Sequence, residues 1–297
     1  MSSANANLHK AKDAKNDEFY TQLTDVSKEL MHYKEHFKDK IVFCNCDDPT
    51  WSAFWKYFHL NFAELGLKKL ISTHYDREKA TYKMEYTGGD DNNIEVGVKT
   101  QLEGNGDFRN QECQDLLDEC DIVVTNPPFS LFREYVALLM KHKKKFLIIG
   151  NKNAITYKEF FPLLKDDEVW IGCTNVKEFL QPDGSIKKFG NIGWFTNLDV
   201  AKRHEKLSLW KQYTTEEYPK YSNYDAINVN KVSEIPVDYD DVMGVPITFM
   251  DFFNPDQFEI IGLDRYTVPK EFLVGGRVAI NGKPKYARIL IRKKVGA

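Results

Sequence analysis

Short apolar runs alternate with amphipathic segments through the first 150 residues of the chain. The apolar runs predict buried strands at residues 41–44, 70–71, 122–124 and 146–149. The amphipathic segments predict helices at residues 28–37, 52–65, 112–120 and 131–140. Alternation of this kind is typical of an α/β fold, in which helices cover both faces of a mostly parallel sheet.

Ligands of such sheets bind at the carboxyl ends of the strands. The polar residues that follow Cys44, Ile71 and Val124 are therefore candidates for a binding site.

Two segments carry the pattern of β-hairpins. Residues 81–86 and 94–99 flank a Gly- and Asp-rich turn and predict a hairpin inserted into the alternation. Residues 277–280 and 286–291 flank Asn281-Gly282, a second hairpin signal. We expect a flexible N-terminus at residues 1–15, a main domain at 16–200 and a smaller region at 201–297, with some late strands returning to the main sheet.

Composition limits the class of protein. The 297 residues are 42% hydrophobic and 29% charged, which excludes a fibrous, membrane-spanning or wholly disordered chain. The polar start lacks the apolar segment of a signal peptide, and we expect a cytoplasmic protein without membrane contact. The five cysteines form no C-x-x-C pair, so neither a disulfide framework nor a zinc ribbon is indicated.

Positive charge collects at the C-terminal end of the chain, although the net charge is -3. Residues 265–297 contain nine basic residues and a single acidic one. Basic side chains in such a cluster can contact the phosphates of a nucleic acid. The candidates for this contact are Arg277, Lys283, Lys285, Arg292, Lys293 and Lys294.

The sequence Asn126-Pro127-Pro128-Phe129 stands where the strand at 122–124 ends and the next helix begins. Two prolines fix two φ angles and remove two N–H donors, so this loop is rigid and offers carbonyl acceptors. If the Asn126 side-chain oxygen and the Pro127 carbonyl each accept an N–H of an exocyclic amine, the nitrogen lone pair is turned towards a methyl donor. Phe129 can stack on the face of the base.

These four residues resemble the (D/N/S)-P-P-(Y/F/W) motif of amino-methyltransferases that use S-adenosylmethionine. A longer resemblance, to the EcoRI-type adenine-specific DNA modification methylases, covers nearly the whole chain. Its segments are residues 16–22, 42–49, 106–108, 125–133, 145–151, 191–197 and 244–262. It implies a Rossmann-like methyltransferase sheet with a smaller C-terminal target-recognition region.

The resemblance also implies which residues hold the cofactor. By position, Phe19, Tyr20 and Thr21 would line its methionine end. The segment that follows the first strand, Asn45 to Pro49, lacks the usual glycines, so the Asp47 or Asp48 side chain would hold its amino or carboxylate groups. Asp76 is a candidate for the ribose hydroxyls, Asp107 for the adenine amine and Phe108 for the adenine ring.

The resemblance thus implies an S-adenosylmethionine-dependent enzyme that methylates adenine N6 in double-stranded DNA after base flipping. It also suggests a cognate restriction endonuclease, and we expect a monomer. The alternatives are an RNA or protein amine methyltransferase that uses the same loop, and a non-catalytic DNA-binding relative. A third alternative is a zinc protease, because residues 32–36 read H-x-x-E-H.

Overall fold

The computed structural model describes residues 20–180 and 185–294. The chain forms two compact units, one of Met1–Lys152 with Ile171–Leu198 and the other of Asn153–Trp170 with Asp199–Ala297. The predicted flexible segment, residues 1–15, lies outside the described residues. Among the described residues, no helix is both long and apolar enough to cross a membrane.

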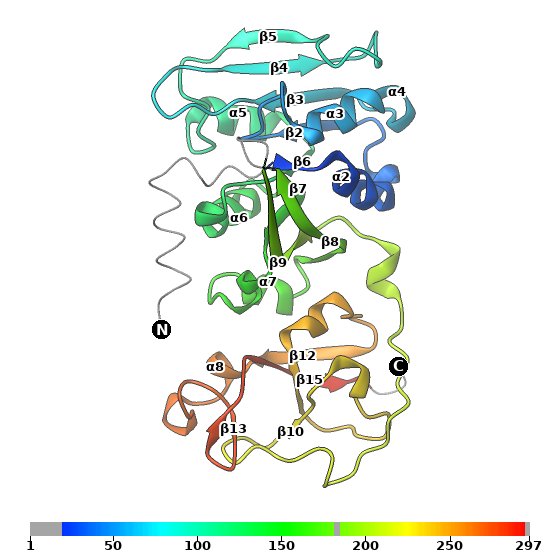
Figure 1. Cartoon of the computed structure of the whole chain (residues 1–297), viewed down its shortest axis with the longest axis vertical. Helices are drawn as coiled ribbons and strands as arrows, with labels where there is room; N and C mark the ends of the chain where they lie inside the picture. The colour runs from blue at the N-terminus through cyan, green and yellow to red at the C-terminus, as the bar shows by residue number, and fades with distance from the viewer. Residues whose placement is uncertain (1–19, 181–184, 295–297) are drawn as a thin grey trace. The chain divides into compact units, whose positions relative to one another are not determined.

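A nine-stranded sheet, in the order β1-β8-β9-β7-β6-β2-β3-β4-β5, organises the first unit (Figure 1). Its strands are β1 (Tyr20–Thr21), β2 (Ile41–Cys44), β3 (Lys69–Thr73), β4 (Tyr82–Tyr86), β5 (Val98–Gln101), β6 (Ile122–Thr125), β7 (Lys145–Asn151), β8 (Trp170–Leu180) and β9 (Ile186–Thr196). The β2, β6 and β7 strands are almost fully buried, as expected for apolar runs covered on both faces.

The helices of this unit lie on both faces of the sheet. They are α2 (Leu23–Leu30), η1 (Met31–His36), α3 (Ala53–Leu60), α4 (Phe62–Leu65), α5 (Gln111–Glu119), η2 (Phe129–Leu131) and α6 (Phe132–Lys141). Figure 1 shows α5 and α6 on one face and α2 and α3 on the other. The predicted α/β class and its strand–helix alternation are therefore confirmed.

The expectation of a mostly parallel sheet was wrong. Among the described residues of this sheet, parallel pairing is confined to the four strands β3, β2, β6 and β7. The predicted inserted hairpin forms β4 and β5, which extend one edge antiparallel. On the other side, β9 pairs antiparallel with β7, and β1 pairs antiparallel with β8. The central parallel strands bring the candidate loops after β2, β3 and β6 to the same edge of the sheet.

The second unit has a sheet of its own, in the order β10-β11-β15-β12. Its strands are β10 (Ile227–Asn228), β11 (Met243–Pro246), β12 (Phe258–Leu263), β13 (Ala279–Ile280), β14 (Lys283–Pro284) and β15 (Arg288–Lys293). Its helices are α7 (Phe161–Lys165), η4 (Ala201–His204), η5 (Val232–Glu234), η6 (Ile247–Asp251), α8 (Asp264–Thr267) and η7 (Lys270–Phe272), while η3 (Lys152–Thr156) begins at the boundary.

The Asn281-Gly282 turn is present, but the hairpin is shorter than predicted. Only β13 and β14 pair across it. The apolar residues after Tyr286 form β15, which pairs instead with β11 and β12, because there its side chains can be buried in the core.

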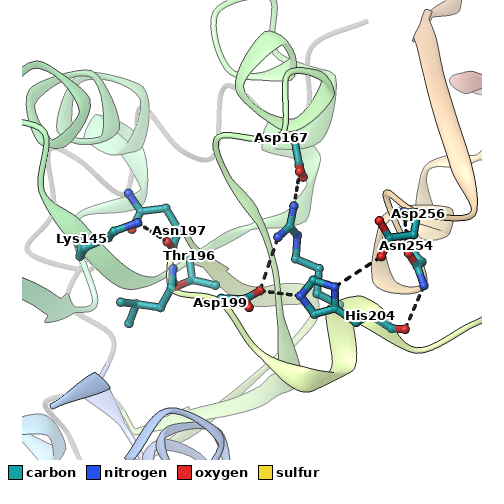
Figure 2. Close-up of polar contacts among 10 residues, drawn as sticks. Lys145, Asp167, Thr196, Asn197, Asp199, His204, Asn254 and Asp256 are labelled. Atoms are coloured by element: carbon teal, nitrogen blue, oxygen red, sulfur yellow. Dashed lines mark hydrogen bonds and ion pairs between the residues drawn. The ribbon is translucent and has the colours of Figure 1, made fainter. Parts of the chain in front are cut away.

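Ion pairs and a hydrogen bond hold residues 197–204, which follow β9 (Figure 2). Within the second unit, the Arg203 guanidinium contacts Asp167, and its Nη1 lies 3.4 Å from Asp199 Oδ1. His204 Nε2 lies 2.8 Å from the same Asp199 oxygen. Within the first unit, Lys145 Nζ donates to the Asn197 carbonyl at 3.0 Å.

Candidate active site

The Asn126-Pro127-Pro128-Phe129 loop leaves the carboxyl end of β6 and leads into η2 and α6. Thr125, the last residue of β6, is fully buried and donates its hydroxyl to the Asn45 carbonyl at the end of β2. The Pro128 carbonyl accepts from Leu131 N at 2.9 Å. Within the described part of the chain, the structure records no hydrogen bond to the Pro127 carbonyl. The loop is thus fixed to the sheet on one side and to a helix on the other.

Phe129 is half-buried, and its ring is held by a second aromatic ring. The centroids of Phe129 and Phe179 lie 6.2 Å apart with the rings nearly perpendicular. Phe179 is fully buried in β8 and contacts Phe189 of β9 in the same way, at 5.5 Å. Edge-to-face pairs of this kind restrict ring orientation, so Phe179 sets how Phe129 lies.

The start of α6 is packed very closely onto β7. A Cβ atom at Gly150 would lie 2.4 Å from Cε2 of Phe132, the first residue of α6. Glycine at this position therefore allows the helix behind the candidate loop to approach the sheet.

The loop after β2 adopts a conformation that glycine usually supplies. Cys46 has a φ of +58°, in the left-handed region. The loop is tied to the neighbouring strand, because Asp47 N donates to the Thr73 carbonyl at 3.0 Å. The missing glycines are thus compensated by a non-glycine residue in a left-handed conformation, which the sequence pattern did not reveal.

The carboxylate of Asp47 accepts a hydrogen bond from the Ser52 hydroxyl. Burial raises the pKa of Asp47 to about 7, although the Ser52 hydrogen bond opposes that rise. A carboxyl group that titrates near neutral pH at the carboxyl edge of a sheet is a candidate for a ligand-binding group.

Asp48 lies beside Asp47 and has a different set of partners. Its Oδ1 accepts from Tyr82 Oη at 2.8 Å and from Thr50 N at 2.9 Å, and its Oδ2 lies 3.7 Å from His74 Nε2. His74 follows β3 and stacks on Tyr82, with the centroids 5.4 Å apart. Sequence reasoning did not select His74 or Tyr82, because only strand pairing brings them next to Asp48.

Asp76 and Asp107 lie in adjacent loops, since Asp76 N donates to the Asn105 carbonyl at 3.0 Å. Asp76 Oδ1 accepts from the backbone N–H of Glu78 at 2.9 Å, and this bond lowers its pKa. Asp107 is held by Arg109, whose Nε donates to Oδ1 at 2.8 Å, and this contact keeps the pKa of Asp107 below its usual value. Both carboxyls are therefore ionised at neutral pH.

The remaining residues that the resemblance selected for the cofactor are buried, paired in a strand or outside the described residues. Phe108 is 2% exposed and packs edge-on against Tyr135 of α6, at 5.0 Å. Phe19 lies outside the described residues. Tyr20 and Thr21 form β1, which pairs with Leu180 and Phe179, and Thr21 is buried. Pro49 is buried in the loop after β2. The cofactor contacts of these residues stay predictions.

The basic residues near the C-terminus fall into two groups. Arg277 Nη1 lies 2.9 Å from Oδ1 of the buried Asp264, Lys293 Nζ lies 3.1 Å from Asp240 Oδ1, and Arg292 Nη1 lies 3.9 Å from Glu259 Oε2. By contrast, no described carboxylate forms an ion pair with Lys283, Lys285 or Lys294. The second group therefore has the charge most available for an anionic partner.

The structure gives no support to the zinc-protease alternative. Its two histidines, His32 and His36, lie in η1. In the part of the chain that is described, no group of three or more His, Cys, Asp or Glu side chains is arranged to hold a metal ion.

Comparison with known proteins identifies the family of the chain. A family model described as "Adenine-specific methyltransferase EcoRI" matches residues 7–294. The chain is 47% identical to type II methyltransferase M.EcoRI of Escherichia coli, over 97% of this chain and 96% of that protein. It is 37% identical to type II methyltransferase M.MpnI of Mycoplasma pneumoniae, over 97% and 98%. No solved structure matches the chain significantly. The chain belongs to the EcoRI family of adenine-specific methyltransferases.

Proposed function

We propose that the chain is a site-specific DNA methyltransferase that transfers a methyl group from S-adenosylmethionine to N6 of an adenine in duplex DNA. The observation that carries this proposal is the rigid Asn126-Pro127-Pro128-Phe129 loop at the end of β6. It lies at the same sheet edge as the acidic loop after β2, to which Thr125 connects it. A methyl acceptor and a methyl donor would therefore meet at one edge of the sheet.

The strand order supports a Rossmann-like methyltransferase sheet. The parallel strands β3, β2, β6 and β7 are followed by β9, which is antiparallel to β7 and lies between β7 and β8.

The residues at the carboxyl ends of β2 and β3 fit S-adenosylmethionine. The cofactor carries a sulfonium and an ammonium group, and Asp47 and Asp48 supply carboxylates that favour positive charge. The left-handed conformation of Cys46 sets the turn of the loop that carries Asp47 and Asp48. Asp107 would accept a hydrogen bond from the adenine amine of the cofactor. Either Asp76 or the Asp48–His74 pair would form hydrogen bonds with the ribose hydroxyls. When bound, the cofactor supplies an electrophilic methyl group.

The chain's own residues prepare the acceptor nitrogen. The lone pair of an adenine amine is delocalised into the ring, so the amine is a poor nucleophile. The Asn126 side-chain oxygen and the Pro127 carbonyl would each accept one of its hydrogens, and this draws the nitrogen towards tetrahedral geometry. Phe129, oriented by Phe179, would stack on the flipped base and offset part of the few kcal/mol that flipping costs.

The two units suggest a division of labour. The first unit holds the proposed catalytic residues, and we assign target recognition to the second, which carries Lys283, Lys285 and Lys294. Genomic DNA as the substrate would place the enzyme in the cytoplasm. A cognate restriction endonuclease and a monomeric state stay predictions.

The test offers tritiated S-adenosylmethionine with duplex DNA, RNA or protein, and then digests the DNA to nucleosides. The proposal predicts label in N6-methyl-2′-deoxyadenosine from duplex DNA and no label in RNA or protein. Label in RNA or in protein would support the corresponding amine methyltransferase. Failure to bind the cofactor in calorimetry would indicate a non-catalytic DNA-binding protein.

A further inference from the structure

The β13–β14 hairpin of the second unit is a short two-stranded ribbon with a tight turn. Ala279 pairs with Pro284 and Ile280 pairs with Lys283. The two turn residues, Asn281 and Gly282, have φ of +49° and +74°. Two consecutive positive φ angles are typical of a type I′ turn, which keeps both strands in register.

The base of this hairpin is held by hydrogen bonds with Ser222 and Asn223, which lie far from it in sequence. Asn223 accepts from Ala279 N at 2.8 Å and donates from Nδ2 to the carbonyls of Phe272, at 2.8 Å, and Arg277, at 3.2 Å. Ser222 N also donates to the Ala279 carbonyl, at 2.8 Å. Because Val278 is fully buried in a core cluster, the hairpin has a fixed base.

The outer part of the hairpin is exposed and basic. Asn281 and Lys283 are exposed, Lys285 is partly exposed, and Tyr286 is 88% exposed. Arg277, at the base, is instead paired with the buried Asp264 and serves the fold. A fixed ribbon with available lysines and polar side chains at its tip is complementary to a polyanion whose grooves expose hydrogen-bonding edges.

We propose that the β13–β14 hairpin enters the major groove of the target duplex and that Asn281 at its tip reads an adenine edge. This inference rests on the proposed function. The major groove admits a two-stranded ribbon, and an asparagine side chain can pair with N6 and N7 of adenine. Lys283 and Lys285 contact the phosphates that flank the groove, and Tyr286 packs against the sugar-phosphate backbone beside them.

The tip is tested with two substitutions that respect its backbone. Asn281→Gly keeps the positive φ and removes the amide, whereas Asn281→Asp keeps the size and replaces the N–H donor by a carboxylate. Each full-length variant is incubated with S-adenosylmethionine and a randomised duplex library, and modified adenines are mapped by single-molecule sequencing. We expect both variants to lose the preference for adenine at one position of the site, with about 10- to 100-fold weaker discrimination there. An unchanged site preference in both would overturn the assignment of Asn281.

The lysines are tested by DNA binding, which needs no methyl transfer. The logarithm of the DNA association constant falls linearly with the logarithm of the salt concentration. In the Lys283→Ala/Lys285→Ala double variant, we expect the magnitude of this negative slope to decrease by about two. The matched control, Lys68→Ala, removes an exposed lysine of the first unit and should leave the slope unchanged. A wild-type slope in the double variant would overturn the phosphate contacts. A wild-type protein that methylates no adenine would contradict the proposed function, whereas methylation with an unaltered site and an unaltered slope would contradict only the role of the hairpin.

Discussion

Replacing Asp47 with asparagine is expected to stabilise the folded chain while it weakens cofactor binding. Burial raises the pKa of this carboxyl from 3.8 to about 7. The folded state therefore binds the proton more tightly than the unfolded state, and stability falls as pH rises from about 4 to 7. Above pH 7 the cost reaches a plateau of at most about 4 kcal/mol.

The pKa of about 7 already includes the opposing effect of the hydrogen bond from Ser52, which a neutral amide accepts more weakly. We therefore expect Asp47→Asn to raise the free energy of unfolding by about 1 to 3 kcal/mol at pH 8. This difference between variant and wild type should fall by about 2.5 kcal/mol at pH 5, which leaves it near zero or slightly negative. Urea unfolding at a series of pH values measures this difference. Asp166→Asn, which alters an exposed carboxylate, is the matched control and should show no such trend.

The same substitution tests the assignment of Asp47 to the cofactor. If the ionised carboxylate holds the ammonium group, wild-type affinity for S-adenosylmethionine should fall below pH 7, and binding at pH 6.5 should release a proton. Calorimetry in buffers of different ionisation enthalpy measures both quantities. Asp47→Asn should bind at least about 10-fold more weakly, because a charge-assisted contact is lost, and without proton release. A stability gain that does not depend on pH, or wild-type affinity in the variant, would refute the reasoning.

Two further substitutions test the surroundings of the catalytic loop. Phe179→Leu should leave cofactor affinity unchanged but lower the single-turnover rate of methylation about 3- to 10-fold, because Phe129 loses the ring that orients it; unchanged rates would contradict this role. Gly150→Ala should destabilise the chain by about 1 to 3 kcal/mol, measured by urea unfolding, because its Cβ would clash with Phe132. The double variant Gly150→Ala/Phe132→Leu should recover most of that loss, and a failure to recover it would place the strain elsewhere.

Local patterns predicted the central strands and most helices, because burial of apolar residues with a period of two or about 3.6 dominates there. The pairing of distant segments was not predictable from such patterns. The addition of β8 and β9 to the sheet, with β9 antiparallel to β7, and the assignment of residues 153–170 to the second unit both depend on tertiary contacts. The local pattern predicts short strands at residues 169–173 and 193–196, but it contains no signal for their pairing or for the unit to which residues 153–170 belong.

The candidate site shows the same limit. Asn126 and the acidic residues after β2 and β3 were selected because their types and their positions after strands carry chemical meaning. The left-handed conformation of Cys46 was not predicted, because it depends on the hydrogen bonds that hold its loop. Arg277 and Lys293 were selected as phosphate contacts, but both have carboxylate partners that lie 13 and 53 residues away in sequence. Charge counted along the chain does not show how much of it is already paired.

Single-turnover transfer by an Asn126→Ala variant is the measurement that bears most directly on the proposed chemistry. Saturating S-adenosylmethionine and duplex DNA are mixed with wild-type and variant protein, methylated adenine is counted, and cofactor affinity is measured in parallel. We predict a loss of about 100- to 1000-fold in rate with unchanged cofactor affinity. The Asn126→Asp variant, which keeps an acceptor oxygen, should retain detectable transfer. Wild-type rates in Asn126→Ala would contradict the claim that this loop activates the adenine amine.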